Sequence, residues 1–291
     1  MSSFSRTQMN PRFFHRSQIK FYLILLPIVV FMVAPILYIV STAFKPMDEL
    51  FLFPPTFFVR NPTLDNFTKL MEQTKTAVPM VRYLMNSIIV TVIVLALSIL
   101  LSTMAGYALS KMKFTGRKVW FEMNQLALMF VAASVAIPRY LVMEKIGIID
   151  TMFAHILPVM AIPVGLFLVK QFIDQIPDSL IEAARIDGAK EFLIYRKIIL
   201  PIIQPAISTV GILSFQTVWN NMDTSMLYTN KESLRTFAFY MNTLANADAG
   251  KTIAGQGINA AATLVMFLPN FIIFVVLQSA MMSTVAHSGI K

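Results

Sequence analysis

Residues 21–44 read FYLILLPIVVFMVAPILYIVSTAF, and this apolar run decides the class of fold. A helix needs about 20 predominantly apolar residues to cross the ~30 Å hydrocarbon core of a bilayer. Similar runs recur through a chain of 291 residues that is 56% hydrophobic and 13% charged, with a mean hydropathy of +0.67. Soluble domains carry about 25% charged residues. The sequence therefore predicts an all-α membrane protein.

Five further apolar runs bring the predicted number of transmembrane helices to six. Lipid offers no partner for backbone N–H and C=O groups, so each run is expected to be helical. Several runs contain Pro or Gly, where we expect kinks. The six predicted spans are Phe21–Phe44, Leu84–Leu109, Val119–Ile137, Thr151–Phe172, Pro201–Trp219 and Ala260–Met282.

Basic residues indicate which side of the membrane each connection faces. Segment 1–20 holds four Lys or Arg and residues 111–118 hold four more. Short cytoplasmic loops are enriched in Lys and Arg. With both termini in the cytoplasm, 14 Lys and Arg lie on the cytoplasmic side and 10 lie outside. We therefore predict cytoplasmic tails at 1–20 and 283–291, and a structured extracytoplasmic segment at 45–83.

Composition also excludes several classes of function. The net charge of +9 follows the ends of the apolar runs, so it indicates membrane topology rather than nucleic-acid binding. The chain has no Cys, which excludes disulfides, thiolate metal sites and a Cys nucleophile. It also has no G-x-x-x-x-G-K-[ST] phosphate loop. We expect no catalytic residues, no cofactor and no metal in this chain.

The most charged stretch of the second half lies between the fourth and fifth spans, DQIPDSLIEAARIDGAKEFLIYRKIIL at 174–200. Pro177 ends the preceding helix, and Ser179 with Glu182 has the spacing of a capping box at the start of a new one. Gly188 suits a C-terminal cap that turns the chain. The pattern predicts a cytoplasmic helix from 178 to 187, followed by a second helix.

This stretch resembles the EAA-x3-G-x9-I-x-L-P loop of type I ABC importer permeases. The wider layout is similar to the carbohydrate branch, the MalG-like sugar permeases, with a basic N-tail, an extra first helix, Pro54-Pro55-Thr56-Phe57 in the outer segment and Asn86-Ser87 opening the second span. The motif residues are Glu182, Ala183, Ala184, Gly188, Ile198, Leu200 and Pro201.

The resemblance implies a binding-protein-dependent permease domain at 84–282, with a coupling loop at 174–201. In that family the loop helix docks in a groove of an ATPase subunit, a helix-in-groove contact. The implied partners are a second homologous permease, two ABC ATPase subunits that bind ATP and Mg, an extracytoplasmic solute-binding protein and a carbohydrate. The implied location is the cytoplasmic (inner) membrane of a prokaryote, as a multi-pass protein in contact with lipid.

A sugar path near mid-membrane calls for aromatic faces and amide groups. Gln216, Trp219, Asn220 and Asn221, just past the fifth span, have this chemistry. A structural explanation competes with it, because Trp is enriched at membrane interfaces and Asn often ends helices. These four residues are therefore candidates for the substrate path.

Three ionisable residues lie close to the predicted spans. Glu122, Arg139 and His155 are candidates by default, since charge inside a membrane is costly. All three lie near span ends, where snorkelling or local pairing explains them as well.

Two other transport functions and one non-transport function remain open. The same machine could move another solute such as a polyamine or phosphonate, because the coupling loop does not specify the cargo. An ion-coupled secondary transporter would need carboxylates within its spans, and only the peripheral Glu122 is present. A membrane scaffold without transport is disfavoured by the coupling motif.

Overall fold

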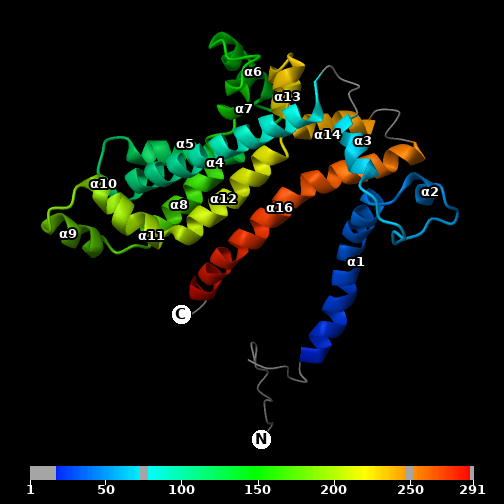
Figure 1. The fold of residues 1–291 in the computed structure, drawn as a ribbon. Coiled ribbons are helices and arrows are strands. Elements are labelled where there is room, and N and C mark those ends of the chain that lie inside the picture. Colours follow the sequence, from blue (N-terminus) through cyan, green and yellow to red (C-terminus); the bar gives the residue numbers. More distant parts are fainter. Residues whose placement is uncertain (1–17, 73–77, 247–251, 289–291) are drawn as a thin grey trace, which may run out of the picture.

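A computed structural model describes residues 18–72, 78–246 and 252–288, and every regular element within these ranges is helical. Four helices form the central bundle (Figure 1). Helix α4 packs against α8 and α12, and α12 packs against α16. Their bounds are Met80–Lys111 for α4, Pro163–Asp174 for α8, Gln204–Trp219 for α12 and Ile253–Ser288 for α16. The predicted all-α class is confirmed.

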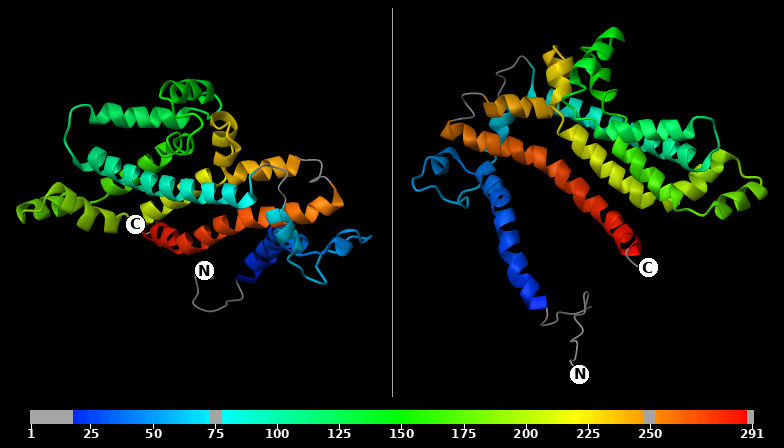
Figure 2. Two further views of the ribbon diagram at one scale, coloured as in Figure 1. Left: turned by 45° about the horizontal axis from the view of Figure 1, so that its top comes forward. Right: turned by 180° about the vertical axis from the view of Figure 1, so that it is seen from behind.

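Helix α1, Ile19–Ala43, leaves the bundle rather than joining it. It packs against α16 near the α3 end, and the two helices diverge from there, as both views of Figure 2 show. Only Ser41, Thr42 and Ala43 of α1 are buried, while Phe31 is 81% exposed. A helix that is apolar all round and exposed within its own chain needs lipid or another protein to cover it.

The segment after α1 forms a compact cap at that end of α16. It contains α2, Met47–Leu50, and α3, Asp65–Glu72. Residues 73–77 of the predicted outer segment 45–83 lie outside the described residues, and its extracytoplasmic position stays a prediction. The buried Glu49 carboxylate accepts backbone N–H bonds from Arg60 at 2.9 Å and Asn61 at 2.7 Å. These bonds, that of Arg60 first, hold the pKa of Glu49 below its usual value. The carboxylate therefore ties the irregular chain around residue 60 to α2.

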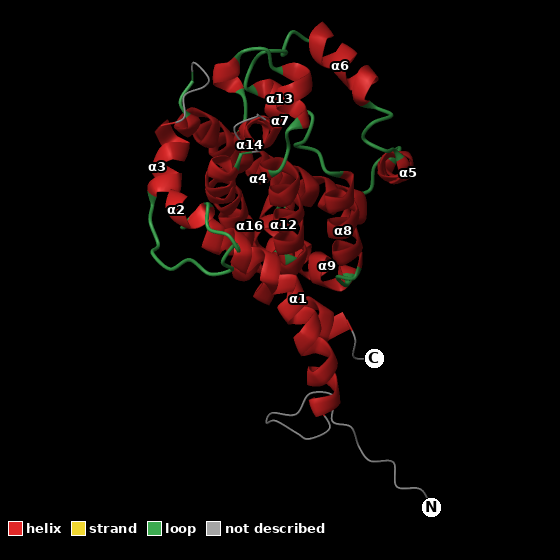
Figure 3. Ribbon diagram, turned by 90° about the vertical axis from the view of Figure 1, so that its right-hand side faces the viewer, coloured by secondary structure: helices red, strands yellow, loops and turns green. Residues whose placement is uncertain are grey.

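The third predicted span is not one continuous helix. Helix α5, Arg117–Met129, is followed by irregular chain at 130–135 and then by α6, Ala136–Lys145. No Pro or Gly occupies 130–135, so no local signal marks the interruption. Figure 3 shows α5 at the edge of the bundle, where it packs mainly against α8.

The fourth predicted span is also interrupted. The structure has a short α7, Phe153–Ile156, then turns and irregular chain, and α8 begins at Pro163. Proline has no N–H to donate and clashes with the preceding helical turn, but it fits the first position of a helix. Pro163 therefore starts a helix here. The prediction of one kinked but continuous helix across 151–172 is wrong.

Three helices of the described chain are long and apolar enough to cross a membrane. They correspond to the first, second and sixth predicted spans, within α1, α4 and α16. A fourth crossing exists if the helical segment Glu191–Ile202 and α12, which meet at a bend of 79°, count as one span. The six-span layout, with both termini in the cytoplasm, stays a prediction.

The close contact between α4 and α8 depends on small residues. A Cβ added at Gly106 would lie 2.7 Å from Cγ1 of Val169, and one added at Gly165 would lie 3.1 Å from Oγ of Ser102. Small residues let helix backbones approach closely where lipid gives no hydrophobic drive between helices. The sequence places these two glycines where the two helices meet.

Short helices cover the bundle at the end opposite α9, near the top of Figure 1. Besides α6 and α7, this region holds α13, Asp223–Tyr228, and α14, Phe237–Asn246. Tyr83 of α4 stacks on Tyr240 of α14, with ring centroids 5.0 Å apart. The stacking joins this covering layer to the bundle.

Candidate functional site

The segment between α8 and α12 forms the helix–turn–helix that its sequence predicts. Helix α9, Asp178–Ile186, is followed by a turn and α10, Glu191–Ile194, and then by a π-helical turn at Tyr195–Ile199 and by α11, Leu200–Ile202. These elements project at one end of the molecule, at the left of Figure 1. We refer to residues 174–201 as the EAA loop.

The two ends of α9 are built differently. No side chain caps its N-terminus and Pro177 occupies the N-cap position, so the predicted capping box of Ser179 with Glu182 is wrong. The ring of Pro177 restricts φ at the N-cap position, so the chain enters α9 with a non-helical backbone there although no side chain caps the helix. At the other end Gly188 has φ +78°, and the amides of Gly188 and Ala189 donate to the carbonyls of Arg185 and Ala184. This is a Schellman cap, which confirms the predicted role of Gly188.

Helix α9 has one buried face and one exposed face. Ile181 is buried and Ala184 is half-buried against the bundle, whereas Glu182 and Ala183 are exposed. Ile186 is 86% exposed, although it is a large apolar residue. Phe192 of α10 is a second large apolar residue of the loop that is exposed, at 66%. Exposed apolar side chains grouped with charged ones are typical of a docking surface.

The other motif residues lie where the chain bends into α12. Ile198 and Leu200 are half-buried, and Pro201 is exposed. Pro201 stands near the start of the short α11, just before the 79° bend. The structure thus brings Glu182, Ala183 and Ala184 together on α9, with Gly188 in the turn that follows, and separates Ile198, Leu200 and Pro201 from them.

Polar bonds join the EAA loop to the end of α4. Lys111 Nζ donates to Asp178 Oδ1 at 2.6 Å, and the Tyr107 hydroxyl donates to Glu191 Oε2 at 2.6 Å. Arg185 also contacts Glu191, at 2.9 Å. Sequence reasoning missed Tyr107 and Lys111, although polar residues four apart at the end of an apolar helix could have signalled a shared polar face.

The bonding partners keep both acidic residues ionised. The hydrogen bond from Lys111 lowers the pKa of Asp178, and the hydrogen bond from Tyr107, more than Arg185, lowers the pKa of Glu191. A depressed folded-state pKa gives a stabilisation that is present above the ordinary carboxyl pKa and lost as pH falls through the shifted value. The bonds to α4 are therefore fully formed at neutral pH.

The four candidates for the substrate path divide into two pairs. Gln216 and Asn220 are exposed at the end of α12. Trp219 is buried and donates from Nε1 to the Met266 carbonyl at 3.0 Å, and Asn221 caps Thr224 through Oδ1. Trp219 and Asn221 therefore hold the end of α12 in place, while Gln216 and Asn220 face away from the core.

Asn270 adds a third amide beside this exposed pair, and sequence reasoning missed it. Its Nδ2 donates to Asn220 Oδ1 at 3.4 Å and to the Met266 carbonyl at 3.1 Å, while its buried Oδ1 has no hydrogen-bond partner within the described chain. A polar residue inside the apolar α16 was the available signal.

The three ionisable candidates have local partners or lie at the edge of the fold. Glu122 is exposed and faces Lys118 at 3.8 Å, and Arg139 is half-buried in α6. His155 is buried, with its ring nitrogens 2.9 Å from Thr224 Oγ1 and 3.2 Å from Thr229 Oγ1. In residues 18–72, 78–246 and 252–288 no three His, Cys, Asp or Glu side chains are grouped to hold a metal ion.

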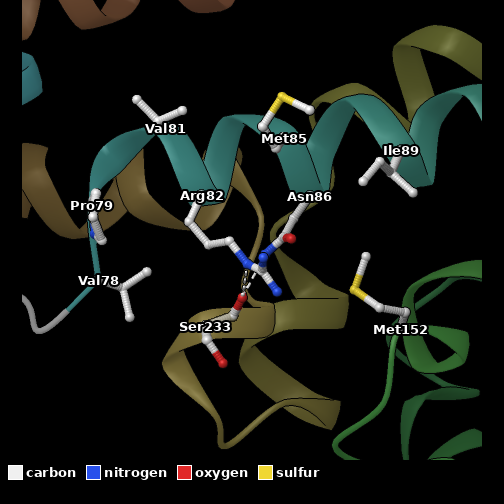
Figure 4. Close-up of a pocket in the computed structure, with 9 residues that line it drawn as sticks. All are labelled: Val78, Pro79, Val81, Arg82, Met85, Asn86, Ile89, Met152 and Ser233. Atoms are coloured by element: carbon white, nitrogen blue, oxygen red, sulfur yellow. Dashed lines mark hydrogen bonds between the residues drawn. The ribbon is translucent and has the colours of Figure 1, made fainter.

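A cleft of about 750 Å³ lies beside the start of α4, far from the EAA loop. Figure 4 shows Arg82 and Asn86 pointing from α4 toward Ser233, and both donate to the Ser233 carbonyl, at 3.3 and 2.8 Å. Apolar side chains such as Met85 and Ile89 form most of the remaining wall. The polar groups of this cleft thus hold the chain before α14 to α4.

Comparisons with known proteins agree on one family. Residues 18–282 match the family described as "Binding-protein-dependent transport system inner membrane component". The arabinooligosaccharides transport system permease protein AraQ of Halalkalibacterium halodurans is 28% identical over 265 residues, covering 89% of this chain and 91% of that protein. The sulfoquinovosyl glycerol transport system permease protein SmoH of Agrobacterium fabrum is 27% identical over 259 residues, or 88% of each chain.

A solved structure has the same fold. It is a chain of a bacterial ABC transporter involved in the import of the acidic polysaccharide alginate, with a TM-score of 0.79 and 23% identity. The match covers 92% of this chain and 99% of that one. The two chains therefore share a fold over most of their length.

Proposed function

Because the chain belongs to the family of binding-protein-dependent transport system inner membrane components, a family of transport subunits rather than enzymes, we propose that it is a permease subunit of an ATP-driven carbohydrate importer. The coupling role rests on the structure of α9. Buried Ile181 anchors this helix to the bundle, Gly188 ends it in a left-handed turn, and the apolar Ile186 is 86% exposed. The exposed face of α9 suits insertion into a groove of an ATPase subunit.

The EAA residues divide the work of coupling. Glu182 offers a charge that fixes the register of docking, and Ala183 permits close approach. Ala184 packs inward, and its carbonyl accepts the amide of Ala189 that closes the helix. Ile198, Leu200 and Pro201 shape the bend that leads from the docked loop into α12.

Docking becomes transport when the ATPase subunits change their separation. Two partner ATPase subunits bind ATP and Mg, and their closure moves the docked loop with them. A ligand shifts a two-state equilibrium only through its different affinity for the two states. The ATP-bound ATPase pair therefore binds the two arrangements of the permease helices with different affinity, and a second homologous permease completes the path.

The proposed topology keeps both termini and the EAA loop in the cytoplasm and crosses the inner membrane of a prokaryote six times. The excess of Lys and Arg on the proposed cytoplasmic side supports it. In this layout the permease domain covers 84–282. The interrupted third span, around α5, crosses beside the bundle, whereas the interrupted fourth span contributes α8 to the bundle. The outer segments 45–83 and 220–257, as far as the structure describes them, face outward, where they help to receive the solute-binding protein.

Carbohydrate is the proposed cargo because two permeases that are similar to this chain over most of its length are named for the transport of arabinooligosaccharides and sulfoquinovosyl glycerol. The exposed amides of Gln216 and Asn220 suit hydrogen bonding to sugar hydroxyls. Trp219 and Asn221 hold the end of α12 in position through their hydrogen bonds to Met266 and Thr224, and so position Gln216 and Asn220. Together the four make the proposed substrate path.

Reversing the charge of Glu182 tests the coupling role. We expect Glu182→Lys to insert normally but to lose the ATPase partner and transport, since a lysine would meet the groove that a carboxylate fits. The tagged chain is purified from its native host in mild detergent, co-purifying subunits are identified by mass spectrometry, and uptake is measured in cells.

Glu144→Lys is the matched control, because Glu144 is also exposed but lies on α6, away from the EAA loop. It should retain both the partner and uptake. Wild-type uptake in Glu182→Lys would refute the coupling role. Activity of the purified chain alone, without ATP, would favour a secondary transporter instead.

Removing the exposed amides tests the substrate path. We expect Gln216→Ala and Asn220→Ala each to raise the sugar concentration for half-maximal uptake by about 2- to 10-fold, the effect of one neutral hydrogen bond. Uptake is measured with the sugar that the binding protein selects in a screen. Gln125→Ala, an exposed amide on α5, should leave uptake unchanged. Unaltered concentration dependence in both path variants would exclude their contact with sugar.

A further inference from the structure

One face of α4 carries three polar side chains at successive turns next to the EAA loop. Thr103, Tyr107 and Lys111 are spaced four residues apart, so they lie above one another on the helix. Thr103 is 1% exposed, Tyr107 is 5% exposed and the Lys111 side chain is 7% exposed. Polar groups buried to this degree must be satisfied by the protein itself.

Each of the three bonds to a different part of the EAA loop. Lys111 bonds to Asp178 at the start of α9 and also to the Ile176 carbonyl, both at 2.6 Å. Tyr107 bonds to Glu191, the first residue of α10, at 2.6 Å. Thr103 Oγ1 lies 2.8 Å from the Tyr195 hydroxyl at the start of the π-helical turn.

The direction of these bonds follows from their other partners. The Thr103 hydroxyl donates to the Ile99 carbonyl at 2.7 Å, so it accepts the hydrogen of Tyr195. Glu191 accepts from Tyr107 with Oε2 and from Arg185 of α9 with Oε1. Glu191 therefore connects α9, α10 and α4, and the rings of Tyr107 and Tyr195, 5.8 Å apart, pack beside it.

Polar bonds of this kind resist relative displacement of the two segments that they join. A hydrogen bond weakens steeply once donor and acceptor leave a narrow range of distance and angle. The covalent chain connects the EAA loop to α8 and α12, but α4 is joined to it only by side-chain contacts.

We propose that Thr103, Tyr107 and Lys111 form a polar linkage that carries the displacement of the docked EAA loop directly to α4. They are positioning residues, and the inference rests on the proposed function. When the EAA loop moves with the ATPase, the three bonds make α4 move as one body with α9 and α10. Without them the loop still docks, but α4 follows only through apolar packing, both against α8 and α12 and between Tyr107 and the buried side chains of the loop.

The test reads movement of α4 at its far end. The chain has no Cys, so Met85→Cys, exposed on the first turns of α4, introduces a single thiol into this subunit. The complete importer is reconstituted with its partner subunits, made cysteine-free, and labelled with a membrane-impermeant maleimide, either without nucleotide or with a non-hydrolysable ATP analogue and Mg²⁺. The nucleotide-dependent change in labelling rate reports the movement of α4.

We expect Tyr107→Phe and Lys111→Met to reduce that change by about 2- to 10-fold, while the ATPase still co-purifies and still hydrolyses ATP. Tyr107→Phe keeps the aromatic ring and removes only the hydroxyl. Lys118→Met, which removes a 91% exposed charge from the neighbouring α5, should leave the change as it is in the parent. Combining Tyr107→Phe with Glu191→Leu should give less than the sum of the two single effects, since each change removes the bond between Tyr107 and Glu191, although Glu191→Leu also removes the contact with Arg185.

Three outcomes would overturn the linkage. One is an undiminished labelling change in both Tyr107→Phe and Lys111→Met, and another is an equal reduction in Lys118→Met. The third is loss of the ATPase subunit from Tyr107→Phe, because the bonds would then hold the loop in shape rather than carry its movement. Glu182→Lys in the same assay separates the linkage from the coupling role. A normal nucleotide-dependent labelling change in Glu182→Lys refutes the coupling role itself. If Glu182→Lys loses that change while Tyr107→Phe keeps it, only the linkage is refuted.

Discussion

Replacing Gly188 by Val is expected to abolish transport and to release the ATPase subunit, although a Cβ at this position would touch nothing within 4 Å. The effect comes from the backbone, since Gly188 has φ +78°. The left-handed region costs ordinary residues about 1–2 kcal/mol and is a true outlier for a β-branched one. One or two kcal/mol is a factor of about 5–30 in the population of the folded turn.

The turn at Gly188 sets the direction of α10 after α9, so its loss misplaces the docking helix relative to α4. Co-purification of the ATPase and uptake in cells measure the result. Gly188→Asn is the matched control, because Asn tolerates the left-handed region, and it should keep much of the activity. Equal activity of the Val and Asn variants would show that the conformation at 188 does not matter for coupling.

Replacing Gly106 by Val is expected to destabilise the whole subunit. Even a single Cβ would lie 2.7 Å from Val169 Cγ1 and 3.4 Å from the backbone nitrogen of Lys170. Overpacking in a tight core costs about 1–3 kcal/mol, and more where backbone must move. Because α4 and α8 form one of the main helix contacts, we expect a lower unfolding temperature in detergent and a lower yield of the assembled importer.

The neighbouring side chain offers a rescue. Gly106→Ala should lower the unfolding temperature by itself, and adding Val169→Ala should restore part of the loss, because it removes the methyl groups that the new Cβ meets. Neighbouring residues show such non-additive effects, while distant ones do not. If the double variant were less stable than the sum of its single changes, steric overlap at this contact would not be the cause.

The predicted substrate path could be read only in part from sequence. Amide and aromatic side chains near the end of α12 had the right chemistry, but residue type does not reveal which way a side chain faces. The packing of α12 against α16 buries Trp219 and leaves Gln216 exposed. The same packing brings in Asn270, which is 50 residues away from Asn220 along the chain.

The span boundaries show a similar limit. Long apolar runs without strong helix breakers, such as α4, became continuous helices. The run at 151–172 did not, because Pro163 starts a helix there, and the run at 119–137 was interrupted at 130–135 without any Pro or Gly. Hydropathy measures whether a segment can enter a membrane and says little about where its hydrogen bonds are broken.

Composition, apolar run length and the left-handed conformation of a Gly act locally along the chain, so the membrane class, the helical character and the glycine turn of the EAA loop could all be predicted from sequence. The tertiary structure alone decided that Thr103, Tyr107 and Lys111 meet that loop and that Trp219 faces inward. The bonds of Lys111, for example, join residues that are at least 65 positions apart along the chain. Only the packing of α4 beside α8 brings such residues within hydrogen-bond distance.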